Sequence, residues 1–346
     1  MELSVDIELT NRCNAKCHFC PRDQTPHEGL MSREVFDQSL LRAIEYREVA
    51  RERLDATVRV SLCGLGEPLL NKHAPEFVRQ VRDAGFEVGI SSNGSILDER
   101  RGNALLDAGL QKILINVGDE GEEYEKVYQL PFDKTRDNVA RFAQMAKGRC
   151  DVHIVLVDHH RDTAHIEKMK DFWRGYGING FYTYGIMNRG GALFVDHMQY
   201  ETLPQLELAR EQLEDKGGHP VCGAPFGYLF VGYDGQYYLC CSDWKKETPM
   251  GSVFDESFLS VTAKKLEYVV TREPVCKTCN LDPLNKLTDE LRAIDAGEAD
   301  AAAGAAVMES VLADNALVHD LVARLGFPVP EPAPRSERRY IPVQAN

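Results

Sequence analysis

The strongest constraint on this chain is an alternation of short β-branched runs with longer amphipathic segments over its first 187 residues. The runs expected to form strands lie at 3–9, 57–64, 86–92, 112–118, 151–158 and 180–187. Segments with a helical repeat of apolar residues include 32–54, 73–85, 98–109 and 165–177. Six strands separated by helices predict a parallel sheet with right-handed crossovers, because parallel neighbours need long connections. The expected class is α/β, with an open sheet or a partial barrel.

The pattern changes after a helix expected at 200–216. The stretch GYLFVGYDGQYYLCC (227–241) predicts two strands joined by a two-residue turn at Asp234 and Gly235. Ala-rich segments over 284–325 predict helices, and the proline-punctuated end is expected to be poorly ordered. We therefore expect three parts: a barrel over 1–217, a small β-hairpin and helix module over 218–283, and a helical extension with a tail over 284–346.

Charge and composition limit the partners of this chain. It has 54 acidic and 40 basic residues, a net charge of −14, and no Lys/Arg run, which argues against nucleic acid as a partner. A basic segment followed by an apolar run is missing at its beginning, and eighteen consecutive apolar residues occur nowhere. The expected location is the cytoplasm, without a membrane partner. Because disulfides are rare there, ten cysteines at short spacings indicate metal ligation or redox chemistry.

Three of those cysteines, Cys13, Cys17 and Cys20, fall within eight residues in CNAKCHFC. A zinc site normally has a fourth Cys or His at matching spacing, and His18 lies between two of the cysteines, where it cannot easily face the same ion. Three thiolates on one loop suit three irons of a [4Fe-4S] cluster, with the fourth iron open to another ligand. A zinc loop or buried core thiols are the alternatives.

The loop resembles that of the radical S-adenosylmethionine (SAM) superfamily, in which Cys-x3-Cys-x-aromatic-Cys follows the first strand of a partial (β/α)6 barrel similar to a TIM barrel; the aromatic residue here is Phe19. The resemblance implies that SAM binds the open iron. Reduction by one electron, from a partner such as flavodoxin or ferredoxin, would then yield a 5′-deoxyadenosyl radical that takes a hydrogen atom from the substrate. The cofactor supplies the chemistry and the protein supplies the positioning.

Further motifs at strand ends agree with this resemblance. CGLGEP (63–68) is similar to the superfamily's Gly-Gly-Glu-Pro element, although Leu65 replaces a glycine, and SSNG (91–94) is similar to its Asn-Gly turn. The resemblance implies that these motifs surround SAM, with Glu67 accepting a hydrogen bond from its ammonium group. The residues expected to bind the cofactor are Phe19, Gly64, Gly66, Glu67, Ser92, Asn93 and Asn116.

A second cysteine set spans the predicted hairpin and a downstream CxxC motif: Cys222, Cys240, Cys276 and Cys279. Four cysteines in this arrangement predict a closed metal site, with zinc and iron–sulfur as equal candidates. Behind a radical SAM barrel, the pattern resembles the Twitch module, a shortened SPASM domain. The resemblance implies one auxiliary [4Fe-4S] cluster.

The motif order over about residues 1–283 resembles the 2-deoxy-scyllo-inosamine dehydrogenase family, whose substrate-binding arginine corresponds to Arg189 in MNRGG (187–191). A charged surface turn is the alternative for Arg189. The resemblance implies oxidation of a secondary alcohol on a small polar substrate, sugar-like or an aminocyclitol, in antibiotic biosynthesis, with one electron passed to the auxiliary cluster. Redox-neutral epimerisation or decarboxylation of a sugar or nucleoside, modification of a ribosomal peptide, and a non-catalytic zinc protein are the other hypotheses.

Several remaining residues have open roles. Cys241 adjoins a cluster ligand and is a candidate hydrogen-atom donor, with packing as the alternative. His159 and His160 follow the fifth strand, and either is a candidate general base or a solvated loop residue. Cys63 and Cys150 are expected to be small buried apolar residues.

Overall fold

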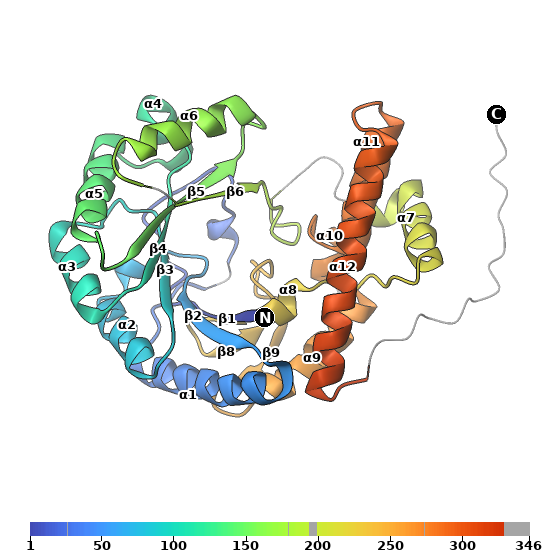
Figure 1. The fold of residues 1–346 in the computed structure, drawn as a ribbon, viewed down its shortest axis with the longest axis horizontal. Helices are drawn as coiled ribbons and strands as arrows, with labels where there is room; N and C mark the ends of the chain where they lie inside the picture. Colours follow the sequence, from blue (N-terminus) through green and yellow to red (C-terminus); the bar gives the residue numbers. More distant parts are fainter. Residues whose placement is uncertain (26, 179, 194–198, 273, 329–346) are drawn as a thin grey trace.

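The computed structural model describes residues 1–328 except 26, 179, 194–198 and 273. Within these residues nine strands form one sheet in the order β6-β5-β4-β3-β2-β1-β7-β8-β9 (Figure 1). The strands are β1 (Glu2–Ile7), β2 (Thr57–Leu62), β3 (Val88–Ser92), β4 (Lys112–Asn116), β5 (Asp151–Asp158), β6 (Gly180–Gly185), β7 (Tyr228–Val231), β8 (Gln236–Tyr238) and β9 (Pro249–Ser252). β1 to β6 pair in parallel, which confirms the α/β class and the open partial barrel expected from the sequence.

Helices cover the outer face of the six parallel strands. They are α1 (Arg33–Val49), continued by a π-helical turn at Ala50–Leu54, α2 (Ala74–Asp83), α3 (Glu99–Ala108), α4 (Gly121–Tyr128), α5 (Phe132–Met145) and α6 (Thr163–Arg174). Figure 1 shows α1, α2, α3 and α5 in an arc outside the strands. Side chains of Ser32, Asp98 and Asp162 accept backbone N–H groups at the starts of α1, α3 and α6, so the sequence itself marks where these helices begin.

The auxiliary region joins the barrel sheet instead of forming a separate one. β7 pairs in parallel with β1, from Ser4 opposite Tyr228 to Ile7 opposite Val231, and β8 and β9 follow antiparallel. The prediction of a two-residue turn at Asp234 and Gly235 is wrong: the Gly232 N–H donates to the Gln236 carbonyl, so the three residues 233–235 form the loop. Gly235, at φ 77°, supplies the left-handed residue that this loop needs.

The other helices are α7 (Pro204–Asp215), α8 (Ala224–Gly227), α9 (Phe258–Thr271), α10 (Pro274–Thr278), α11 (Pro283–Asp295) and α12 (Ala301–Leu325), with short 3₁₀ turns at Arg22–Gln24, Pro68–Leu70 and Tyr200–Thr202. α7, α11 and α12 pack together around a second apolar core that includes Leu206, Leu284 and Met308 (Figure 1). By length and composition alone, α12 could also cross a membrane. The predicted tail after residue 328 lies outside the described residues.

Candidate functional site

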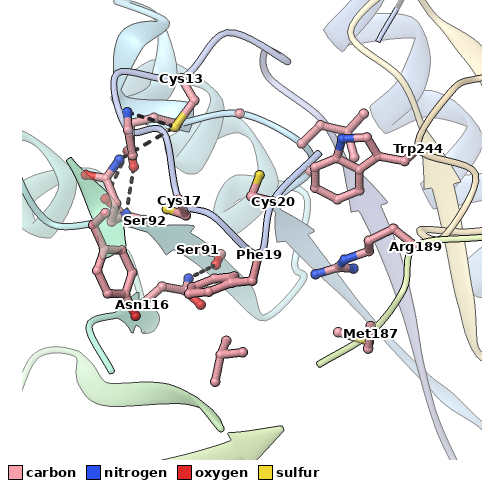
Figure 2. Close-up of a pocket in the computed structure, with 18 of the residues that line it drawn as sticks. Cys13, Cys17, Phe19, Cys20, Ser91, Ser92, Asn116, Met187, Arg189 and Trp244 are labelled. Atoms are coloured by element: carbon pink, nitrogen blue, oxygen red, sulfur yellow. Dashed lines mark hydrogen bonds between the residues drawn. The ribbon is translucent and has the colours of Figure 1, made fainter. Parts of the chain in front are cut away.

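A pocket opens at the carboxyl ends of the parallel strands, where barrels gather their active sites (Figure 2). It brings together eleven residues singled out from the sequence: Cys13, Cys17, Phe19, Cys20, Gly64, Gly66, Glu67, Ser92, Asn93, Asn116 and Arg189. These residues come from five separate segments of the chain. Unrelated turn or core residues would not be expected to meet in one pocket, so the convergence of these residues supports a common site.

The loop that carries Cys13, Cys17 and Cys20 is held by backbone hydrogen bonds to α4. The N–H groups of Lys16 and His18 donate to the carbonyls of Tyr128 and Val127, at 3.1 and 3.2 Å. Burial raises the pKa of the Cys13 thiol to about 11, and it raises the pKa values of Cys17 and Cys20 as well. Buried thiols of this kind ionise readily only when a metal neutralises them, because a lone buried thiolate is poorly solvated.

Gly66 and Glu67 bring the second strand's loop against the cysteine loop. A Cβ atom on Gly66 would lie 2.3 Å from the Arg12 carbonyl oxygen, so only glycine fits this close approach. The neighbouring Glu67 side chain is 1% exposed. Its carboxylate accepts hydrogen bonds from the Asn93 N–H at 2.7 Å, the Ser92 hydroxyl at 2.9 Å and the Leu69 N–H at 3.1 Å. Burial nevertheless raises the pKa of Glu67 to about 7.

The Asn-Gly turn after β3 contacts the cysteine loop directly. The Asn93 side-chain amide donates to Asn14 Oδ1 at 3.0 Å and lies 3.8 Å from the Cys13 sulfur. Asn116, at the end of β4, donates to the Ser91 hydroxyl at 3.2 Å. These contacts place three strand ends beside one sulfur-lined cavity.

Arg189 reaches the pocket from a tightly held turn after β6. Arg189, Gly190 and Gly191 all have positive φ, at 53°, 61° and 85°. The turn is tied to the auxiliary region because the Thr278 hydroxyl donates to the Gly190 carbonyl and the Asn280 side chain donates to the Ile186 carbonyl. The Arg189 guanidinium lies 4.9 Å from the centre of the Trp244 ring, and both side chains line the pocket. Figure 2 shows them across the cavity from Cys13 and Cys17.

The second cysteine set also converges. Cys240, Cys276 and Cys279 are buried and Cys222 is half-buried. Burial raises the pKa values of all four thiols, to about 12 for Cys222, and a further increase for Cys222, Cys240 and Cys276 comes from neighbouring thiols of the set. The Leu281 N–H donates to the Cys279 sulfur at 3.4 Å. Such a closed set of four thiols fits a fully ligated metal centre.

Sulfur spacing at both sites can be compared with that of a zinc ion. A tetrahedral zinc ion with Zn–S bonds of about 2.3 Å holds its sulfurs about 3.8 Å apart. Among the residues that the structure describes, neither cysteine set brings three sulfurs within 4.8 Å of one another. Neither set therefore has the sulfur spacing of a bound zinc ion in this structure.

Three other residues predicted to act in catalysis do not line the pocket: His159, His160 and Cys241. The carboxylate oxygens of Asp119 accept hydrogen bonds from the Nε2 atoms of His159 and His160, at 2.8 Å each. Cys241 is half-buried, close enough to Arg189 for their charges to interact. Cys63 and Cys150 are half-buried, and burial raises both thiol pKa values, in keeping with packing roles.

Sequence reasoning missed two features of this region. Trp244 lines the pocket, and its indole N–H has no hydrogen-bond partner among the described residues. Lys246, two residues later, forms a buried ion pair with Glu8 at 2.6 Å. Neither residue lies in a motif with a characteristic spacing, so their roles emerge only when the auxiliary region packs on the barrel.

The fold and the two cysteine sets define an iron–sulfur protein built on a partial barrel. Comparison with known families agrees: residues 7–172 match the radical SAM superfamily, and residues 222–280 match the SPASM iron–sulfur cluster-binding domain. The chain therefore contains a radical SAM domain followed by a SPASM-type domain. Its cofactors are SAM with a [4Fe-4S] cluster at the first site and auxiliary iron–sulfur at the second.

Curated relatives share part of the chain. A PqqA peptide cyclase of Xanthomonas axonopodis pv. citri is 26% identical over 62% of this chain and 57% of its own length. A probable GTP 3′,8-cyclase of Methanothermobacter thermautotrophicus is 31% identical over 46% of this chain and 50% of its own. The chain thus spans about half the length of these relatives.

Solved structures share the fold. BtrN in complex with AdoMet and 2-DOIA has a TM-score of 0.53 at 18% identity, covering 81% of this chain and 93% of that one. The anSMEcpe enzyme with AdoMet and a bound peptide has a TM-score of 0.56 at 14% identity, covering 90% of this chain and 100% of that one. At these identities, the likeness extends to the fold.

Proposed function

We propose that the protein is a radical SAM oxidoreductase that oxidises a secondary alcohol of a small polar substrate, sugar-like or an aminocyclitol, to a ketone. The observation that carries this proposal is the position of Arg189 and Trp244. They lie in one pocket with the cysteine loop and on the side held by the auxiliary cysteine region. A substrate bound to them would therefore lie between the two clusters.

Alcohol oxidation removes a hydrogen atom from carbon, a proton from oxygen and one electron, and water can accept the proton. When bound, SAM and its reduced cluster supply the radical that takes the hydrogen atom, and the auxiliary cluster supplies the electron acceptor. The pocket residues bind and orient the alcohol. Arg189 offers up to five N–H donors to hydroxyl oxygens, and Trp244 offers its unpaired indole N–H.

The four-cysteine set supports oxidation over redox-neutral chemistry. A cluster with all four irons ligated by protein has no site for substrate, which leaves electron transfer as its function. Cys241, the candidate hydrogen donor for epimerisation, does not line the pocket, so the geometry gives the redox-neutral alternative no support.

The test uses anaerobically reconstituted protein with dithionite, SAM and a panel of aminocyclitols and sugar alcohols. The expected product is a ketone two mass units lighter than its alcohol, formed together with 5′-deoxyadenosine. Cys276→Ala should still release 5′-deoxyadenosine but form no ketone, whereas Cys17→Ala should lose both products. Exchange of solvent deuterium into an unoxidised product would contradict the proposal and support epimerisation.

Peptide modification is a second candidate, supported by the relatives. The PqqA peptide cyclase is 26% identical over 62% of this chain, and SuiB, with a TM-score of 0.54, was solved with its precursor peptide. If this candidate is right, a peptide encoded near the gene will gain a cross-link, and the alcohol panel will give no ketone.

A further inference from the structure

Outside the SAM pocket, three histidines converge on one carboxylate. Asp119 follows β4, His159 and His160 follow β5, and His165 lies in the first turn of α6. The Nε2 atoms of His159 and His160 lie 2.8 Å from different oxygens of Asp119, and the Nε2 atom of His165 lies 3.1 Å from one of them. All three imidazoles thus direct the same ring nitrogen at the Asp119 carboxylate.

This cluster is partly enclosed. The side chains of Asp119 and His159 are 0% and 3% exposed, whereas those of His165 and His160 are 20% and 31% exposed. A buried carboxylate needs fewer hydrogen-bond donors than three imidazoles provide. Hydrogen bonding to Asp119 alone therefore does not account for all three histidines. The exposed side at His160 also provides a path from solvent.

We propose that Asp119, His159 and His160 bind a divalent zinc-class metal ion, beside which His165 contacts Asp119 at 3.1 Å. Imidazole nitrogen with one carboxylate oxygen suits zinc, whereas calcium and magnesium select oxygen and copper(I) selects sulfur. One ligand atom each from Asp119, His159 and His160 lies within 4.8 Å of the others. Ligands about 2.0–2.1 Å from a tetrahedral ion stand about 3.3 Å apart, so the two 2.8 Å contacts between Asp119 and the imidazoles would open by about half an ångström.

The proposed site lies directly behind the cysteine loop. The His159 ring contacts His18, whose ring centre is 4.8 Å away, and Phe19, at 5.5 Å. His18 stands between two cluster cysteines, and Phe19 lines the SAM pocket. A metal that fixes His159 would therefore brace the loop that carries the first cluster, as a structural ion without a step of its own in the reaction.

Elemental analysis and X-ray absorption can test this proposal on the full-length, cluster-loaded protein. After equilibration with zinc and removal of the excess, we expect about one zinc per chain, with nitrogen and oxygen at about 2.0–2.1 Å. Zinc absorption is element-specific, so iron does not interfere. Zinc surrounded by sulfur at about 2.3 Å, or no stoichiometric zinc, would overturn the proposal, because the ion would then occupy a cysteine site or none.

Variants supply the second arm. The double variant His160→Ala/His165→Ala should lower zinc affinity at least tenfold. Loss of a residue that only hydrogen-bonds to a metal ligand already lowers metal affinity by about 10–100-fold. His160→Gln is the milder variant, since His160 is the most exposed of the four side chains. His73→Ala is the matched control: His73 pairs with Glu76 at 3.2 Å, away from the cluster, and should leave zinc binding unchanged. Unaltered zinc binding in folded double variant and His160→Gln protein would also overturn the proposal.

Discussion

The Lys246 ammonium donates to Glu8 Oε2 at 2.6 Å, joining the residue that follows β1 to the auxiliary region 238 positions later. The other Glu8 oxygen accepts the Leu65 N–H at 2.9 Å, beside the SAM pocket. Lys246 also lies over the rings of Tyr233 and Tyr238. The buried Glu8 carboxylate therefore links the first strand, the CGLGEP loop (63–68) and the auxiliary region.

Lys246→Met should destabilise the protein strongly. The side chains of Lys246 and Glu8 are 5% and 0% exposed, and removal of one partner leaves a buried charge unpaired, at about 3–5 kcal/mol. Chemical denaturation of the cluster-loaded protein measures this loss. Arg33→Met is the control, because it breaks the exposed Arg33–Glu76 pair, whose charges are screened by solvent and contribute little. Equal effects of the two substitutions would contradict a structural role for the Glu8–Lys246 pair.

SAM affinity should rise with pH and level off above about 7. Burial raises the pKa of Glu67 to about 7, although the Asn93 and Leu69 N–H groups and the Ser92 hydroxyl act against it. Only the ionised carboxylate attracts the SAM ammonium, so binding below this pKa requires loss of a proton, and affinity falls by up to about tenfold per pH unit. Calorimetric titration between pH 6 and 8 measures the trend. Glu67→Gln should bind SAM weakly, without this pH dependence.

Trp244→Phe should weaken substrate binding without slowing SAM cleavage in the absence of substrate. The substitution keeps the ring over Arg189 and removes the unpaired N–H. Loss of one hydrogen bond to a bound substrate costs about 1–2 kcal/mol, or roughly 5–30-fold in KM. Trp173→Phe is the control, since its indole donates to the Val117 carbonyl in the core, and it should alter stability instead of KM. An unchanged KM in Trp244→Phe would remove Trp244 from the substrate site.

Lys265→Met should lower the reduction potential of the auxiliary cluster. Lys265 is buried and donates to the Pro225 carbonyl at 3.2 Å, and its charge interacts with Cys240. Burial lowers the pKa of Lys265 to about 8, so the ammonium is still charged at pH 7. A nearby positive charge favours the reduced cluster, and its loss should shift the potential down by on the order of 50 mV. A redox titration followed by electron paramagnetic resonance measures the shift.

The neighbouring lysine provides the control for that measurement. Lys264 lies on the same helix, but its side chain is 45% exposed and pairs with Glu256. Lys264→Met should leave the potential close to that of the unaltered protein, because solvent screens its charge. A similar shift in both variants would contradict a specific effect of Lys265.

Local sequence determined the main elements of the fold and singled out the cysteines that we propose as cluster ligands. Cys13, Cys17 and Cys20 are close in the chain, so their spacing alone limits the metal that they hold. The parallel strands were predictable because their apolar runs alternate with amphipathic helices. The helices α4 and α5 were not predicted from the sequence. Tyr124, Val139 and Phe142 are buried in them, but the apolar residues of these segments give a weaker helical repeat.

Tertiary structure alone decided what surrounds those ligands. Arg189 faces Trp244 because Thr278 and Asn280 hold its turn, and these residues are some 90 positions away. The histidines after β5 turn to Asp119 and not to the SAM pocket, which no local pattern indicates. Periodicity and spacing report interactions within a few turns of the chain, whereas these contacts depend on which strand ends and domains pack side by side.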